Sequence, residues 1–226
     1  TTDMRTPYAW FLSSVPTGLF PEGNLSNDIE YGKNRALLSW YYIDPIFYGS
    51  TSSCPEHIRK DKDYLKNNLI RRITTEELFP EREKVYGESS YIQTFNLSFY
   101  PSERGPYNIY AKDGNFDSNG KLTKPETRFG GIMRKLDNTN FESNNIEYIE
   151  FWLMDPFVYD STGVMKGGDF YINLGDISED ILKDGRKTFE NGFPGNLADT
   201  ITLDKSVWGY IPVEQSVSNS FEREES

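Results

Sequence analysis

Residues 115–126 carry the pattern most specific for a chemical function, that of a calcium-binding loop. Oxygen-bearing side chains stand at its odd positions, a glycine stands at the sharp turn, and a final glutamate can bind a cation through both oxygens. The matching residues are Asn115, Asp117, Asn119, Gly120, Leu122 and Glu126, with Asp113 nearby as a further oxygen ligand. The pattern predicts a Ca²⁺ site whose ligands are Asn115, Asp117, Asn119 and Glu126.

A polar hairpin loop explains the same residues without a metal. Asn115 stands where the calcium motif usually has Asp, and Pro125 stands where a helix would begin. Asp, Asn and Gly are also common in turns, because they tolerate left-handed backbone conformations. The two interpretations, a calcium loop and a plain turn, both remain open, and we expect no other cofactor.

Catalytic chemistry has little support in the sequence. The only cysteine and the only histidine, Cys54 and His57, stand close together without an orienting partner. Glu147 and Glu150 fall on opposite sides of an extended segment, so that segment alone does not offer a carboxylate pair. We therefore expect no catalytic residue and a non-enzymatic protein. A glycoside hydrolase stays open as an alternative, since acidic residues are many although no spacing singles out a pair.

Tight backbone geometry accounts for a second set of motif residues. Glycines in the segments 104–106 and 130–131 allow sharp turns and close approach of neighbouring backbone. Glu150 lies among aromatic residues, where an unpaired buried carboxylate is costly, so we expect it to pair with Arg128 or Arg134. The residues assigned to structural motifs are Arg104, Gly105, Pro106, Arg128, Gly130, Gly131, Glu150 and Trp152.

Period-two alternation of apolar and polar residues predicts β-strands as the main elements. The clearest strand segments are 91–99, 146–154 and 170–174, and shorter candidates lie at 107–110, 132–136 and 207–212. The apolar and aromatic run at 36–42 suits either a strand or a short buried helix. Residues 146–154 are apolar on both faces, which is typical of a central strand covered on both sides. The sequence therefore predicts a mainly β fold, an antiparallel β-sandwich that resembles a jelly roll, with a short helical insertion.

Helix signals concentrate in residues 55–79. Pro55 near a helix start and apolar residues at helical spacing predict a helix over about 55–72. Thr74 and Glu77 form a capping box, in which the hydroxyl accepts from the Glu77 amide and the Glu77 side chain reaches back. Residues 178–185 suit an N-capped helical turn closed by a glycine.

The domain division follows from these elements. Residues 1–84 form an extended segment with the helical insertion near 55–79, residues 85–215 form the sandwich core, and residues 216–226 form a polar tail.

Composition and charge exclude several classes of partner. The 226 residues include 24 Lys plus Arg and 35 Asp plus Glu, a net charge of −11, and the isoelectric point is about 4.7. Such a chain does not attract nucleic acid or anionic lipid. Its 15% aromatic content can build a folded core. The first ten residues have no signal-peptide pattern, so we expect an internal or mature portion of a protein.

Six motifs resemble the SprA/Sov family, the outer-membrane translocon proteins of type IX secretion and gliding motility in Bacteroidetes. They read YYIDP (41–45), ELFP (77–80), FYPSERGPYN (99–108), RFGGIMR (128–134), NIEYIEFWLMDPF (145–157) and LGDISED (174–180). The resemblance runs from about residue 31 to residue 214. It implies that this chain is a non-enzymatic, extracytoplasmic soluble region of a much larger outer-membrane protein.

The resemblance also implies partners. These are the rest of the parent chain, a PorV-like shuttle, a plug protein and folded cargo proteins in transit through the cell outer membrane. Two short Asp-Ser/Thr-apolar patterns, at 160–162 and 199–201, fit the O-glycosylation pattern of the bacteria that carry this family. The alternative is a carbohydrate-binding β-sandwich module at the cell surface. That module would need two or more coplanar exposed aromatic rings, for instance among Trp10, Trp40 and Trp208.

Overall fold

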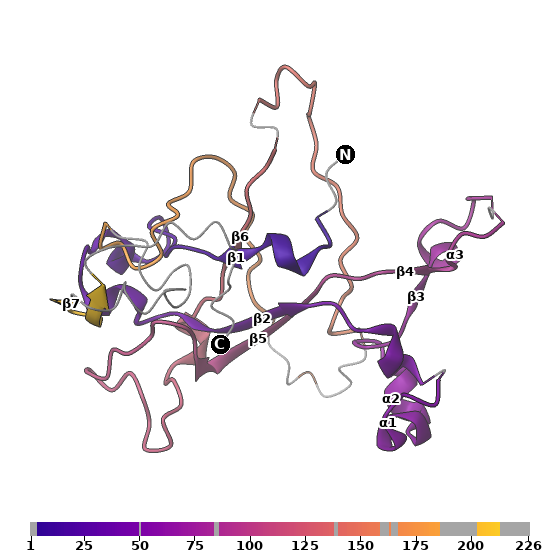
Figure 1. Cartoon of the computed structure of the whole chain (residues 1–226), viewed down its shortest axis with the longest axis horizontal. Helices are drawn as coiled ribbons and strands as arrows, with labels where there is room; N and C mark the ends of the chain where they lie inside the picture. The colour runs from indigo at the N-terminus through magenta and orange to yellow at the C-terminus, as the bar shows by residue number, and fades with distance from the viewer. Residues whose placement is uncertain are drawn as a thin grey trace. The chain divides into compact units, whose positions relative to one another are not determined.

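The computed structural model describes residues 4–49, 51–83, 86–137, 140–158, 163, 167–185 and 203–212. Over these residues the helices are few and short, and the strands form small antiparallel pairs. The pairs are β1 with β6, β2 with β5, β3 with β4 and β7 with β8 (Figure 1). The mainly non-helical, antiparallel character agrees with the prediction. A jelly-roll sandwich is a finer statement than these two-stranded sheets show.

The chain gathers into two compact units, each discontinuous in sequence. The first unit combines Thr1–Ala9, Trp40–Leu97 and Lys135–Phe170, and the second combines Trp10–Ser39, Ser98–Arg134 and Tyr171–Ser226. Among the described residues, the buried apolar and polar side chains are Pro7, Val15, Glu22, Tyr31, Arg35, Ala36, Cys54, Asn108, Tyr110, Asn115, Leu122, Ile181 and Leu182. All of these except Pro7 and Cys54 belong to the second unit, which therefore holds most of the packed core of the described residues.

The longest ladder joins β2 (Ala36–Tyr41) to β5 (Asn96–Arg104). At one end the Gly105 amide donates to the Arg35 carbonyl at 3.3 Å, and at the other the Asn96 side chain donates to the Tyr41 carbonyl at 3.3 Å. The two strands therefore run antiparallel. The strand interpretation of residues 36–42 is confirmed. The predicted strand at 91–99 appears as β4 and the start of a longer β5.

The other strand pairs are short. They are β1 (Phe11–Leu12) with β6 (Ile132–Met133), β3 (Ile73–Thr74) with β4 (Tyr91–Ile92), and β7 (Leu203–Ser206) with β8 (Gly209–Pro212). Single turns of 3₁₀ helix lie at Pro7–Ala9, Pro21–Asn24, Ile29–Gly32, Pro45–Tyr48 and Pro125–Thr127. Isolated two-stranded sheets are marginal in water, so these pairs depend on packing from other segments.

The predicted helix at 55–72 is two short helices, α1 (Glu56–Lys60) and α2 (Lys62–Lys66). Asp61 separates them because its backbone is extended, with φ −87° and ψ 94°. Its carboxylate accepts hydrogen bonds from the amides of Asp63 and Tyr64, at 3.1 Å and 2.9 Å. An Asp that can cap a new helix competes with helix continuation, which explains the break.

The capping-box prediction before α3 (Thr75–Leu78) is half correct. The Thr74 hydroxyl accepts from the Glu77 amide at 3.2 Å, as expected. The Glu77 carboxylate does not complete the box, because it takes both terminal nitrogens of Arg71, at 2.9 Å and 2.5 Å. This pair lowers the pKa of Glu77. A two-point guanidinium bond is stronger than one bond to a neutral amide.

Four predicted elements are not found. Residues 146–154 and 170–174 carry no ladder, and residues 107–110 form a loop in which Tyr107 has a left-handed φ of 62°. Residues 178–185 are not helical: the Asp180 carboxylate instead accepts from the amides of Asp184 and Gly185, at 3.2 Å and 2.8 Å. Alternation fixes only which faces are apolar, while a ladder also needs a second strand at the right distance.

Some predictions fall outside the described residues. These are the glycosylation-like patterns at 160–162 and 199–201 and the polar tail at 216–226. In the part of the chain that the structure describes, no helix is long and apolar enough to cross a membrane.

Candidate functional site

The motif residues near 104–108 and 128–131 surround one short piece of backbone in the second unit. The Lys33 carbonyl accepts from the side chains of Asn108, Asn115 and Arg128, at 3.1, 3.3 and 2.8 Å. The Asn108 amide also donates to the Arg35 carbonyl at 2.6 Å. Asn108 is 1% exposed, so these bonds satisfy carbonyls that water does not reach. The arrangement holds the fold together and offers no reactive group.

Arg128 completes this polar cluster. Its guanidinium donates to the carbonyls of Thr123 and Lys33 and to the side chain of Asn34, at distances between 2.6 Å and 2.9 Å. Partial burial lowers the pKa of Arg128. Its bonds go to neutral oxygens. Glu150 is exposed, so the expected burial of Glu150 is wrong, while its pairing with Arg128 or Arg134 stays a prediction.

Arg35 is buried within the same unit and is 1% exposed. Its Nη1 donates to the Ser13 carbonyl at 2.8 Å, and its guanidinium lies 5.3 Å from the centre of the Phe129 ring. Burial lowers the pKa of Arg35 to about 10. At neutral pH the group therefore stays a cation, held by a carbonyl and an aromatic face.

The glycine pair 130–131 is required by close packing. A Cβ at Gly130 would lie 2.7 Å from the Leu38 Cβ and 3.0 Å from the Phe99 ring. A Cβ at Gly131 would lie 2.3 Å from the Ser13 hydroxyl oxygen. The segment therefore crosses the β2–β5 ribbon at a distance that only glycine permits.

The calcium-loop residues form a tight turn in which one carboxylate oxygen of Asp117 accepts two backbone amides. The Asp117 carboxylate accepts from the amides of Asn119 and Lys121, at 2.8 Å and 2.9 Å, and these backbone bonds lower the pKa of Asp117. The Asn115 side chain points inward and donates to the Tyr110 carbonyl at 2.9 Å. Among the described residues, no group of three or more acidic, His or Cys side chains could hold a metal. Calcium binding here, with Glu126 as a ligand, stays a prediction.

Cys54 and His57 do not form a nucleophile and base. The Cys54 thiol is buried, and its sulfur lies 3.7 Å from the Pro55 carbonyl oxygen. His57 is exposed on α1.

An exposed stretch of the first unit, residues 146–154, is the strongest candidate for a binding surface. Several of its large side chains lie mostly in solvent: Tyr148 is 76%, Trp152 68% and Leu153 69% exposed. No backbone hydrogen bond joins residues 147–154 to another described residue. Contiguous apolar groups exposed in this way mark sites of association. The prediction that this segment is a covered central strand is wrong for the described structure.

Turns hold both ends of the exposed stretch. Before it, the Asn140 side chain accepts from the Ser143 amide at 2.9 Å, and the Ile146 amide donates to the Phe141 carbonyl at 3.0 Å. After it, the Asp155 carboxylate accepts from the Phe157 amide at 2.8 Å. Local bonds therefore shape the flanks, while the stretch itself is neither helix nor paired strand.

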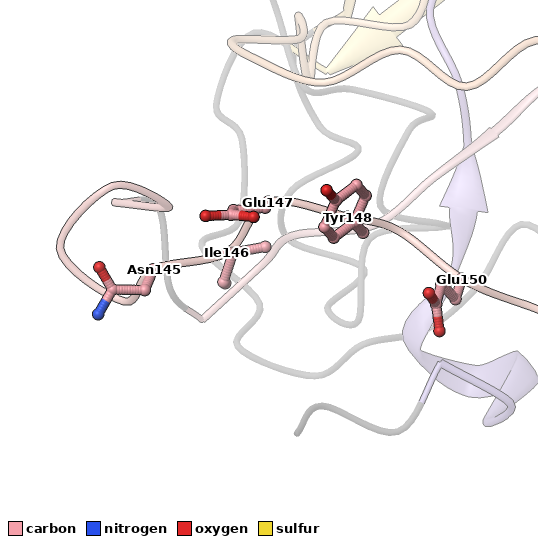
Figure 2. Close-up of a pocket in the computed structure, with 5 residues that line it drawn as sticks. All are labelled: Asn145, Ile146, Glu147, Tyr148 and Glu150. Carbon is pink, nitrogen blue, oxygen red and sulfur yellow. The ribbon is translucent and has the colours of Figure 1, made fainter.

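Figure 2 shows the hollow beside the start of this stretch, which has a volume of about 430 Å³. The residues that line it are Asn145, Ile146, Glu147, Tyr148 and Glu150. All come from one run of backbone and all are exposed, so the hollow cannot enclose a small molecule as ligand pockets usually do. Its chemistry is that of an acidic, aromatic surface.

Two ring contacts tie the exposed stretch to other parts of the first unit. The Trp152 ring meets the Phe79 ring edge to face at 6.1 Å, and the Phe151 ring lies 6.0 Å from that of Phe170. Such pairs contribute about 0.5–1.5 kcal/mol each beyond the area that they bury. They steady the stretch without covering it.

The structural roles of Arg35, Arg72 and Asn108 were not predicted from the sequence. The Arg72 guanidinium lies between two rings, 4.7 Å from the centre of Tyr48 and 4.6 Å from that of Tyr91. These contacts join residues far apart in sequence, so no local spacing reveals them. Only Asn108 had a signal in the sequence, since it directly follows the turn residues Gly-Pro-Tyr. An Asn side chain near a turn often forms hydrogen bonds to backbone groups.

Comparison with known proteins gives no relative from which a function could be read. No family model matches the chain, and no curated protein matches it. The function is therefore argued from the residues themselves.

Proposed function

We propose that this chain is a non-enzymatic structural and interaction region of an outer-membrane protein-secretion translocon of the SprA/Sov kind. Two lines of argument support the proposal. The first is the resemblance of six ordered motifs to that family. The second is the exposed stretch 146–154, which coincides with the longest of those motifs and presents apolar side chains to solvent.

The exposed stretch is the observation that carries the proposal. Burying one large apolar side chain contributes about 1.5–3 kcal/mol, so a run of exposed ones is costly unless another surface covers it. A region of a larger translocon has such surfaces available, in the rest of the parent chain, in partner subunits and in cargo. Its place is then an extracytoplasmic region at the cell outer membrane.

The sandwich fold belongs to the same proposal. The described sheets are pairs, and pairs gain stability when further strands widen them. We propose that the segments at 146–154 and 170–174 belong to an antiparallel, jelly-roll-like sandwich in which 146–154 is an edge strand with one side open to a partner.

Secretion in cells tests this function. In the full-length parent, Phe151→Ser together with Leu153→Ser should leave the outer-membrane level normal while cargo accumulates in the periplasm. The matched control is Leu19→Ser with Ile109→Ser, which removes two side chains of similar exposure from the second unit. Normal cargo release by the first variant, at a normal level of the parent, would contradict the proposal.

The alternative of a carbohydrate-binding module gains no support from the rings that it named. The Trp40 indole is half-buried and donates to the Pro7 carbonyl at 3.2 Å, and Trp10 and Trp208 are also half-buried. Sugar stacking needs open ring faces. Glycan binding becomes the hypothesis to test if the secretion experiment fails.

A further inference from the structure

We propose that the exposed stretch 146–154 binds an extended segment of another polypeptide by strand addition, and that this segment combines apolar residues with Lys or Arg. The inference rests on the proposed function, because it names how that interaction region takes its partner. It commits to one kind of occupant, a cationic strand.

The backbone of the exposed stretch supplies the first argument. Its amides and carbonyls from residue 147 to residue 154 make no bond to any other described backbone group, and turns flank it at both ends. An extended segment with free donors and acceptors is a template for an added strand. No proline interrupts residues 146–154, whereas β5, which has a partner, carries Pro101.

The side chains supply the second argument. One face of the stretch carries Ile149, Phe151 and Leu153, and the other carries Tyr148 and Trp152. An added strand places its own side chains beside these, and apolar or aromatic cross-strand pairs stabilise the pairing on both faces. A partner strand that is apolar at alternate positions therefore fits.

Charge selects the partner. Residues 140–158 contain four carboxylates, Glu142, Glu147, Glu150 and Asp155, and no Lys or Arg, a charge of −4. Natural edge strands are commonly protected against pairing by Lys, and this stretch has none. Carboxylates repel an acidic strand and attract a basic one, and like charges directly opposite each other destabilise a strand pair. The segment therefore discriminates in favour of a cationic strand.

Binding of a defined peptide tests the inference on the full 226-residue chain. The probe is a short fluorescein-labelled peptide of Val and Thr with two Lys residues, followed by fluorescence anisotropy at low salt. Two control peptides replace the Lys residues by Glu or carry N-methyl groups on alternate amides. We expect binding of the Lys peptide, weakened about tenfold or more by N-methylation, because a strand edge is lost. Equal binding of the N-methylated peptide would overturn strand addition.

Variants of the protein locate the site. Ile149→Pro removes one amide donor and should weaken binding about tenfold, while Ile149→Val keeps the donor and the branched shape and should bind normally. Glu147→Lys with Glu150→Lys should weaken binding about three- to tenfold, against Glu81→Lys with Glu83→Lys as a control of equal charge change. Unchanged binding by Ile149→Pro, or equal effects of the two charge pairs, would overturn the inference, as would no binding of the Lys peptide.

The same variants separate this inference from the proposed function. If Ile149→Pro secretes cargo normally in the parent while Phe151→Ser with Leu153→Ser does not, strand addition fails and the interaction role stands. If neither variant affects secretion, the proposed function fails, whatever the peptide binds.

Discussion

Two regions that the sequence predicts as strands differ in whether they pair. β2 and β5, most of whose residues belong to the second unit, pair with each other, and a glycine segment crosses them so closely that a Cβ at Gly130 would clash with Leu38. In the first unit, residues 146–154 carry apolar side chains on both faces but pair with no described strand. Apolar content is therefore not what decides pairing. What differs is a neighbour with glycine and asparagine residues that let its backbone approach and bond.

The polar cluster around Asn108 explains why the loops of the second unit can pack closely together. Lys33 and Arg35 turn their carbonyls toward Asn108, which satisfies both with one amide group. Buried carbonyls without partners are costly, so this asparagine makes the close approach of two loops tolerable. The exposed stretch has no such polar partner among the described residues, and its carboxylates favour solvent or a cation.

Hydrogen exchange should show the largest difference between the two regions. We expect peptides covering residues 36–41 and 98–104 to exchange about a hundredfold or more slowly than peptides covering 147–154, because the former carry ladder bonds. Exchange followed by mass spectrometry measures this. Strong protection of residues 147–154 from exchange in the isolated chain would mean that the stretch is already covered. It would contradict the proposed difference between the two regions.

Gly105→Ala should be the most damaging single substitution in the second unit. Its Cβ would lie 2.4 Å from the Ala36 carbonyl oxygen and 2.7 Å from the Ala36 carbonyl carbon, both backbone atoms that cannot move aside. We expect the free energy of unfolding to fall by about 3 kcal/mol, read from urea midpoints. Gly18→Ala is the control, since nothing lies within 4 Å of its Cβ. Equal effects of the two would show that close approach does not hold this unit together.

Asn108→Ala should cost less, about 2 kcal/mol, by leaving two buried carbonyls with fewer donors. The matched control is Asn144→Ala in the first unit, whose exposed side chain donates to the Asn140 carbonyl at 2.7 Å. That change should stay within about 0.5 kcal/mol, because water replaces the lost bond. Urea unfolding compares the two, and a cost for Asn108→Ala as small as the control would mean that the polar cluster is dispensable.

The sequence predicted local chemistry better than pairing. The Thr74 hydroxyl capping the Glu77 amide, and the strand at residues 36–42, followed from short-range rules. The unbroken helix failed because Asp61 can cap as well as continue a helix, and local rules do not weigh the two. The expected burial of Glu150 was wrong, because burial depends on where distant segments lie.

The candidate site shows the same limit. Alternation identified residues 146–154 as apolar on both faces, and from this we expected a covered strand. Whether such a strand is covered depends on a partner segment. The same apolar pattern occurs in strands that have a neighbouring strand and in strands that do not. The acidic charge of the stretch was readable from the sequence, whereas its exposure needed the structure.

The smallest expected effect is a pH dependence confined to the second unit. The Tyr110 hydroxyl donates to the Asp113 carboxylate at 2.5 Å, and this bond raises the pKa of Tyr110 to about 12, from about 10 in an unfolded chain. A raised pKa in the folded state contributes stability that is present below about pH 10 and is lost as pH rises toward about 12. Asp113→Asn should lower the pKa of Tyr110 and reduce that loss.

Tyrosine carbon NMR shifts, with Tyr110→Phe to assign the signal, measure the titration, and urea midpoints at pH 9 and above measure the stability. If Asp113→Asn changes neither the pKa of Tyr110 nor the pH dependence of stability, the Tyr110–Asp113 bond does not stabilise the second unit. The difference in packing between the second unit and the exposed stretch then depends on the glycine and asparagine contacts alone.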